Sequence, residues 1–279
     1  MNDPVEALIT AEELPPGYRE VVERHWRPLA ARIGARPERP LIVGVNGAQG
    51  SGKSTLCRFL AVLLAEQGLR AVTLSLDDLY LTRAERQRLA RECHPLFATR
   101  GVPGTHDVAL GMRVLDELAG EGPVTLPRFD KSADDRAQAG DLVHAPVDVV
   151  LFEGWCVGAV PQEAAALTVP VNALEAQEDQ DGRWRGEVNR RLATDYAQLF
   201  GRIDLLVMLK VGSFDVVRTN RALQEQKLAR KRPGGSAIMD AAALDRFVMH
   251  YERLTRWTLQ EMPRRADVVI PIGADHRPA

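Results

Sequence analysis

A glycine-rich segment near residue 50 has the spacing of a phosphate-binding loop. The run Gly47-Ala48-Gln49-Gly50-Ser51-Gly52-Lys53-Ser54 matches GxxxxGK[ST] in full, and Thr55 follows it. Glycines let the backbone aim successive N–H groups at phosphate oxygens, and a helix starting here would add its positive N-terminal end. Lys53 would reach the β- and γ-phosphates, and the Ser54 hydroxyl would ligate Mg²⁺. The spacing therefore predicts a site for a nucleoside triphosphate and Mg²⁺.

Acidic residues follow two short apolar runs elsewhere in the chain. Asp77 and Asp78 come directly after Ala71–Leu76, and Glu153 follows Val149–Phe152. If both runs are parallel strands, these carboxylates emerge at the edge of the sheet that carries the phosphate loop. We expect Asp77 to accept the proton of a substrate hydroxyl, the alternative being helix N-capping by either aspartate. Glu153 is expected to hold Mg²⁺ or its water shell, the alternative being a solvated glutamate at a strand end.

The apolar pattern predicts the elements that must position these residues. Buried strands are expected at Leu41–Val45, Ala71–Leu76, Pro123–Leu126, Val149–Phe152, Leu205–Val211 and Val268–Ile270. Helices are expected at 53–67, 108–118, 188–200, 214–230 and 241–260, and the polar segment 175–186 is expected to be a loop. Strands that alternate with helices predict an α/β fold, here a three-layer α/β/α P-loop NTPase with a mostly parallel sheet. Residues 1–39 are expected to form an N-terminal helical extension to a main domain of residues 40–279.

Composition excludes several classes of protein. The 279 residues contain 36 Lys and Arg and 38 Asp and Glu, a net charge of −2, which argues against nucleic acid or an anionic membrane as the main partner. No apolar run approaches the roughly 18–20 residues needed to span a bilayer. The N-terminus lacks the basic segment followed by an apolar segment that is typical of a signal peptide. The three cysteines are scattered singly, which suits a reducing compartment. These features predict a cytoplasmic protein and leave its oligomeric state open.

The remaining residues favour a small-molecule kinase among nucleotide-binding proteins. The sequence contains no Asn-Lys-x-Asp guanine reader, which argues against a GTPase. A kinase needs a base, an acid for Mg²⁺ and basic residues that fold over the transferred group. A segment at about 215–236 is rich in Arg and Lys and contains a Pro-Gly-Gly hinge, so we expect a helical lid there. An alternative is that these basic residues form a solvated helix face.

Several motifs occur together and in order between about residues 40 and 273. They are Gly44–Thr55, Ser75-Leu76-Asp77-Asp78-Leu79-Tyr80, Arg100-Gly101-Val102-Pro103-Gly104-Thr105-His106-Asp107, Pro127-Arg128-Phe129-Asp130-Lys131, Glu153-Gly154-Trp155-Cys156-Val157-Gly158 and Arg221-Ala222-Leu223-Gln224-Glu225-Gln226, with Asn172, Leu174, Trp184-Arg185, Asn189, Tyr196 and Tyr251 between and after them. This set resembles P-loop kinases of the uridine kinase, phosphoribulokinase and pantothenate kinase group, and most of all the D-glycerate 3-kinase family of plants and fungi. The sequence departs from that family at Asn220, where the family usually has Trp, and residues 1–39 match no motif.

The resemblance implies that MgATP phosphorylates D-glycerate to 3-phosphoglycerate. A small hydroxy acid needs a cation for its carboxylate and polar partners for its hydroxyls. Arg100 and Arg128 are the candidates for the carboxylate, and Asp77, Tyr80, His106 and Asp107 are the candidates for the remaining substrate contacts, with Asp130 and Lys131 as further possible contacts. The family likeness also selects Arg221 as the lid residue that stabilises the transferred phosphoryl group.

Each of these residues could instead have a purely structural role, and the fold could serve another function. Arg100 and Arg128 could be surface charges, His106 could be a core histidine, and Trp155 could be core rather than a pocket wall. The same fold could act on another hydroxyl substrate, such as a nucleoside or pantothenate. Less favoured is a nucleotide-switch ATPase stimulated by a protein partner, which would need no small-molecule acceptor.

Overall fold

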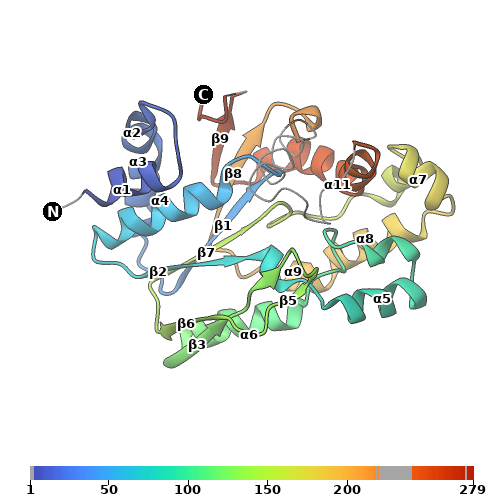
Figure 1. Cartoon of the computed structure of the whole chain (residues 1–279), viewed down its shortest axis with the longest axis horizontal. Coiled ribbons are helices and arrows are strands. Elements are labelled where there is room, and N and C mark those ends of the chain that lie inside the picture. The colour runs from blue at the N-terminus through green and yellow to red at the C-terminus, as the bar shows by residue number, and fades with distance from the viewer. Residues whose placement is uncertain (1–2, 218, 220–240, 274) are drawn as a thin grey trace.

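A central sheet of five parallel strands organises the computed structural model, which describes residues 3–217, 219, 241–273 and 275–279 (Figure 1). The strand order is β2-β7-β1-β8-β9. These strands are β1 (Leu41–Gly47), β2 (Ala71–Ser75), β7 (Val149–Gly154), β8 (Leu205–Val211) and β9 (Val268–Ile272). Each coincides with one of the predicted buried runs, and the predicted α/β fold with a mostly parallel sheet is confirmed.

The described helices surround this sheet (Figure 1). In chain order they are α1 (Pro4–Ala11), α2 (Tyr18–Val21), a π-helical segment (Val22–Trp26), α3 (Arg27–Gly34), α4 (Lys53–Ala65), α5 (Arg83–Glu92), α6 (Val108–Ala119), α7 (Ala173–Glu178), α8 (Arg183–Ala193), α9 (Asp195–Phe200) and α11 (Ala241–Glu261). Short 3-10 turns lie at Leu76–Leu79, Pro95–Ala98, Ala164–Leu167 and Met262–Arg264.

Successive residues of β1 face opposite layers, as strand geometry requires. Val43 belongs to a buried cluster with α4, whereas Ile42 belongs to a second cluster with α6, α9 and α11. The predicted extension at residues 1–39 packs on the first of these layers, beside α4 (Figure 1). Val22, Trp26 and Ile33 are buried there together with residues of α4 and β1. The sheet is thus covered by helices on both faces.

Two small antiparallel sheets lie outside the central sheet and correct one prediction. The strand predicted at residues 123–126 forms as β3 (Gly122–Leu126), but it pairs antiparallel with β6 (Asp141–Ala145) instead of joining the parallel sheet. A second hairpin joins β4 (Phe129–Asp130) to β5 (Asp135–Arg136). Burial alternates along β3, with Val124 and Leu126 buried and Pro123 and Thr125 exposed, which suits an antiparallel pair with one solvated face and not a parallel strand buried on both faces. This excursion places the chain of residues 127–136 beside the end of β2.

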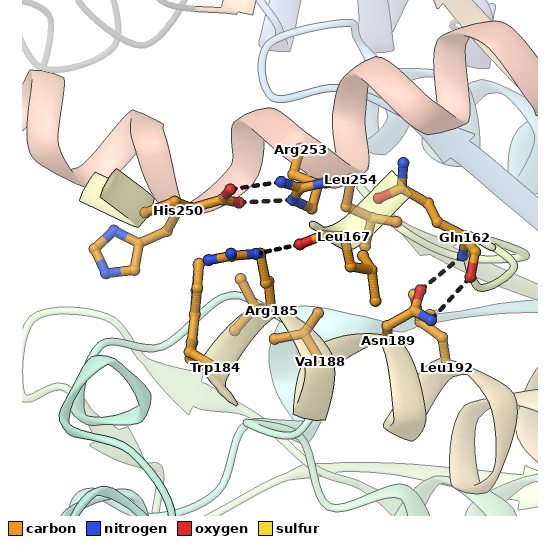
Figure 2. Close-up of a pocket in the computed structure, with 12 residues that line it drawn as sticks. Gln162, Leu167, Trp184, Arg185, Val188, Asn189, Leu192, His250, Arg253 and Leu254 are labelled. Atoms are coloured by element: carbon orange, nitrogen blue, oxygen red, sulfur yellow. Dashed lines mark hydrogen bonds and ion pairs between the residues drawn. The ribbon is translucent and has the colours of Figure 1, made fainter. Parts of the chain in front are cut away.

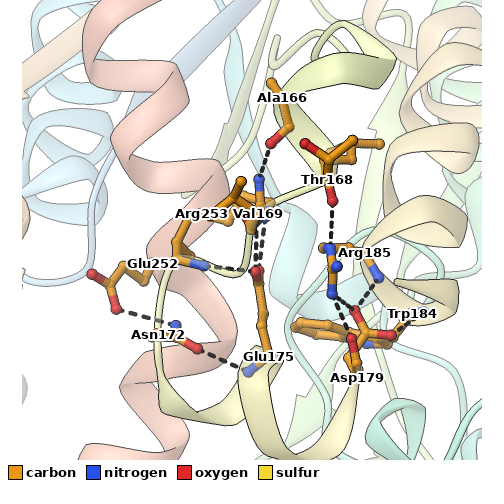
Figure 3. A network of polar contacts seen from close by, with 12 residues as sticks. Ala166, Thr168, Val169, Asn172, Glu175, Asp179, Trp184, Arg185, Glu252 and Arg253 are labelled. Atoms are coloured by element: carbon orange, nitrogen blue, oxygen red, sulfur yellow. Dashed lines mark hydrogen bonds and ion pairs between the residues drawn. The ribbon is translucent and has the colours of Figure 1, made fainter. Parts of the chain in front are cut away.

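The segment 175–186 is not the loop that its polar composition predicts. It contains the end of α7 and the start of α8, and the predicted helix at 188–200 is divided between α8 and α9. Glu175 and Asp179 are buried because each pairs with an arginine, Arg253 at 2.6 Å and Arg185 at 2.8 Å (Figure 3). Buried ion pairs therefore account for acidic residues that composition alone assigns to solvent.

Among the described helices, none combines the length and the apolar composition that a membrane span requires.

Candidate active site

The phosphate loop joins β1 to α4 at the carboxyl edge of the sheet. Gly50 and Gly52 have φ angles of 75° and 92°, which L side chains adopt rarely, so the loop needs glycine at both positions. Gly52 is the N-cap of α4 and no side chain caps the helix, which leaves the N–H groups of its first turn open to an anion. At Gly47 a Cβ would collide with Ser51 Oγ and lie 3.0 Å from Leu209 Cβ. Glycine is therefore required at three positions of the loop, Gly47, Gly50 and Gly52.

The lysine and serine of the motif lie beside the glutamate at the end of β7. Lys53 Nζ donates to the Ala48 carbonyl at 3.2 Å, and Ser54 Oγ donates to Glu153 Oε1 at 3.2 Å. Burial lowers the pKa of Lys53, while the charges of Glu153 and Asp77 oppose that shift. Glu153 itself is 8% exposed and lies opposite Val45 of β1. A hydroxyl and a carboxylate oxygen this close form a hard-oxygen donor pair that fits Mg²⁺.

Asp77 lies in the 3-10 turn after β2 and is held on both carboxylate oxygens. Lys131 Nζ is 2.6 Å from Asp77 Oδ2, and the Tyr80 hydroxyl donates to Asp77 Oδ1 at 3.0 Å. Burial raises the pKa of Asp77, but the charge of Lys131 and its hydrogen bond outweigh burial and hold that pKa at about 2. Thr82, not an aspartate, caps the following helix α5 with a capping box to Glu85. The capping alternative for Asp77 is thus not realised at α5.

His106 lies close to Asp77 and is buried. Its ring stacks on Tyr80 with centroids 4.5 Å apart, and its Nδ1 is 2.6 Å from the Tyr196 hydroxyl oxygen. Burial lowers the pKa of His106 to about 3, although the charge of Asp77 opposes the shift, so the imidazole is neutral near pH 7. Its Nε2 has no hydrogen-bond partner within the described residues. His106 is therefore a packed residue with one nitrogen still able to bond a ligand.

The other predicted substrate residues already have partners within the protein. Arg128 pairs with Asp78 at 2.6 Å and with Asp141 at 2.5 Å. Asp107 caps α6 by accepting from Leu110 N at 2.9 Å and also pairs with Arg136. These bonds fix Arg128 and Asp107 in structural positions, whatever further contact they make.

Of the remaining predicted site residues, Arg100 and Trp155 lie in the described part of the chain and Arg221 does not. Arg100 pairs with Asp134 and lies over the Phe129 ring, 5.6 Å from its centroid. Arg221 and most of the predicted lid at 215–236 lie outside the described residues. Trp155 is core, with its Nε1 donating to the Gly101 carbonyl at 2.9 Å.

Three residues that the sequence does not single out make polar contacts that hold the site together. Asn46 is buried at the end of β1 and donates to the carbonyls of Trp155 and Val157, which ties the phosphate-loop strand to the segment after Glu153. Arg86 is fully buried and pairs with Asp134, although it lies in α5, where six of the ten residues are charged. Arg136 donates to the Tyr80 carbonyl at 3.3 Å as well as to Asp107. The available signals are that Asn46 directly precedes the phosphate loop and that Arg136 follows the Asp130-Lys131 motif, whereas Arg86, inside a largely charged helix, has none.

Three residues of the ordered motif set, Asn189, Asn172 and Tyr251, connect α7, α8 and α11 to neighbouring segments beside the site. Asn189 exchanges two hydrogen bonds with the backbone of Gln162 in a small pocket between α8 and α11 (Figure 2). Asn172 caps α7 by accepting from the Glu175 N–H (Figure 3), and it donates to the Met249 carbonyl of α11. Tyr251 of α11 donates to the Arg100 carbonyl at 3.1 Å. Tyr251 thus holds the segment that carries Arg100, whereas Asn189 and Asn172 join α8 and α7 to other neighbouring segments.

A parallel α/β sheet with a phosphate loop after its central strand and carboxylates at the neighbouring strand ends defines a P-loop nucleotide-binding protein. No family model matches the sequence. It is 36% identical over 229 residues to an uncharacterized kinase, mug58, of Schizosaccharomyces pombe, covering 77% of this chain and 80% of that protein. It is 32% identical over 225 residues to the chloroplastic D-glycerate 3-kinase of Arabidopsis thaliana, covering 76% of this chain but 46% of that protein. This chain thus spans less than half the length of the plant relative.

A solved structure gives the same result at the level of the fold. D-glycerate 3-kinase from Cryptococcus neoformans matches with a TM-score of 0.73 at 26% identity, over 92% of this chain and 98% of that chain. The chain belongs to the P-loop kinase family that includes D-glycerate 3-kinase, uridine kinase and pantothenate kinase. It is therefore a phosphotransferase, and ATP is the substrate that this family implies.

Proposed function

We propose that this kinase transfers the γ-phosphoryl group of ATP to the 3-hydroxyl of D-glycerate, giving ADP and 3-phosphoglycerate. Two relatives named above are D-glycerate 3-kinases, which supports the assignment. The observation that carries it is the setting of Asp77, a carboxylate at the sheet edge with cations around it. Lys131 contacts it directly, and Arg100 and Arg136 lie on the neighbouring segments. A base beside several cations suits an acceptor that carries both a hydroxyl and a negative charge.

Each residue of the site has a proposed role. The open N–H groups of the phosphate loop and Lys53 would hold the β- and γ-phosphates. Ser54 and Glu153 would hold Mg²⁺, which when bound would neutralise charge on the phosphates. Asp77 would take the proton of the acceptor hydroxyl, and Nε2 of His106 would bond an acceptor oxygen. Arg221, within the proposed lid at 215–236, would stabilise the charge on the transferred group.

The experiment is a test of ADP release from MgATP with a panel of acceptors: D-glycerate, L-glycerate, uridine, pantothenate and none. We expect strong stimulation by D-glycerate and a background rate with the other four. Stimulation by uridine or pantothenate instead would move the proposal to another hydroxyl substrate of the same fold. The same rate with every acceptor and with none would reject the small-molecule kinase reading and favour a partner-stimulated ATPase.

A further inference from the structure

The base proposed for the reaction is held in a state that accepts protons poorly. Both oxygens of Asp77 are engaged, Oδ2 by the Lys131 ammonium at 2.6 Å and Oδ1 by the Tyr80 hydroxyl at 3.0 Å. The pKa of Asp77 near 2 reflects this pairing, which outweighs the effect of burial. A general base works best when its pKa is near the working pH, so a carboxylate held this far below it is a weak base. Something must loosen the Lys131 contact for Asp77 to act well.

The Lys131 side chain can leave Asp77 without moving the segment that carries it. Lys131 lies in the turn between β4 and β5 and its side chain is 61% exposed. The turn is fixed by other bonds, because Asp130 Oδ1 accepts from the backbone N–H of Ser132 at 2.8 Å. The entry to the hairpin is fixed as well, because Asp78 Oδ1 accepts from the Phe129 N–H at 3.0 Å. Rotation of the lysine stem is therefore the movement that the structure leaves open.

The arginines around the base are held by carboxylates that take no part in the proposed chemistry. Arg128 is shared by Asp78 and Asp141. Arg100 pairs with Asp134, which also binds the buried Arg86. Lys131 differs from them because its ion-pair partner, among the described residues, is the base itself. An anion that binds Lys131 would thus change the state of Asp77, whereas an anion that binds Arg128 would not.

We propose that the carboxylate of the acceptor replaces Asp77 as the partner of Lys131, so that binding of an acidic acceptor frees the base. This inference rests on the proposed function. In the transfer, the 3-hydroxyl proton moves to Asp77, the bond from O3 to the γ-phosphorus forms, and the bond from that phosphorus to the β,γ-bridging oxygen breaks to leave ADP. A neutral alcohol with the same hydroxyl leaves Lys131 on Asp77. Lys131 is then both a binding residue and the residue that discriminates against neutral alcohols.

The test compares D-glycerate with glycerol, which has the same hydroxymethyl group and no carboxylate. In Lys131→Met we expect the KM for D-glycerate to rise by about tenfold or more, the loss that follows removal of one charge-assisted bond. We expect kcat/KM for glycerol to rise by a few-fold, since Asp77 is no longer paired. The matched control is Arg24→Met, which removes an exposed cation from its pair with Glu20 far from the site and should leave both acceptors unaffected.

The outcomes separate this inference from the proposed function. If Lys131→Met lowers kcat/KM for both acceptors by the same factor, Lys131 only positions Asp77 and the inference is overturned. An unchanged KM for D-glycerate in the folded variant overturns it as well. If the wild-type protein does not phosphorylate D-glycerate, the proposed function fails and the inference fails with it. Circular dichroism and the Kd for MgATP establish that the variant is folded and binds nucleotide, and Lys131→Gln repeats the test with a polar side chain.

Discussion

Asp77 is a carboxylate whose affinity for a proton is lowered mainly by Lys131. Its place after β2 aims it at the edge of the sheet where Lys53 and Glu153 also lie. Lys131 and Tyr80 then lower its pKa to about 2 against the opposing effect of burial. The capacity of Asp77 to act as the proposed base therefore depends on a contact made by the hairpin of β4 and β5, which lies more than 50 residues further along the chain.

The variant Asp77→Asn keeps the shape of this side chain and removes its capacity to accept a proton. We expect kcat to fall by about 10²- to 10⁴-fold, the usual contribution of a general base, while the Kd for MgATP changes by less than about threefold. Steady-state kinetics and nucleotide titration measure the two quantities. Asp116→Asn, which removes an exposed partner of Arg202, serves as the control and should retain wild-type kinetics. An unchanged kcat in Asp77→Asn would remove this residue from the chemistry.

Local spacing predicts some site residues and leaves others open. The phosphate loop is predictable because its geometry is built within eight consecutive residues, Gly47 to Ser54. The engagement of Arg128 by Asp78 and Asp141 is not, because it depends on β3 leaving the parallel sheet to pair with β6. Arg86 is hidden for a similar reason, since one buried arginine does not alter the charged pattern of α5.

Among the elements, α11 and α7 form a wall that is held by two ion pairs of different burial. Arg253 of α11 binds both oxygens of Glu175, and the two side chains are 11% and 1% exposed (Figure 3). Arg246 of the same helix binds both oxygens of Glu178, but these side chains are 47% and 43% exposed. The sequence could predict α11 from its periodicity, but it could not predict α7, because burial of Glu175 requires a partner 78 residues away.

Loss of either ion pair should weaken the contact between α7 and α11, but to a different extent. Arg253→Met leaves a buried carboxylate without its cation, and we expect the free energy of unfolding to fall by about 3 kcal/mol or more. Arg246→Met removes a solvent-screened pair from the same helix and should change it by less than about 1 kcal/mol. Urea unfolding of the two variants measures the difference. Equal losses would mean that burial does not set the strength of the connection between α7 and α11.

For the molecule as a whole, buried ionisable groups make stability depend on pH. His106 has an ordinary pKa of 6.5 in the unfolded chain, and burial lowers its pKa to about 3 in the folded protein. Between these values the unfolded state binds a proton that the folded state does not, so stability falls as pH falls from about 6.5 toward 3. Asp77, whose pKa falls from 3.8 to about 2, adds a loss of the same sign below about pH 4. Acid therefore weakens the fold around the site.

His106→Asn removes the histidine share of this dependence. We expect the wild-type protein to lose up to about 1.4 kcal/mol of unfolding free energy per pH unit from His106 between pH 6 and 4, and the variant to lose that much less. Urea unfolding at pH 7, 6, 5 and 4 gives the slope. His144→Asn, at an exposed position in β6, should keep the wild-type slope. If the two variants have the same slope, His106 is not a buried neutral histidine.

The identity of the phosphorylated product tests the proposed function most directly. The protein is incubated with ATP, Mg²⁺ and D-glycerate, and the product is identified by phosphorus NMR, with Lys53→Ala as the matched inactive variant. If the proposed function is right, we expect 3-phosphoglycerate and ADP in equal amounts from the wild-type protein and neither from Lys53→Ala. Phosphate on the 2-hydroxyl, inorganic phosphate alone, or the same yield from Lys53→Ala would contradict it.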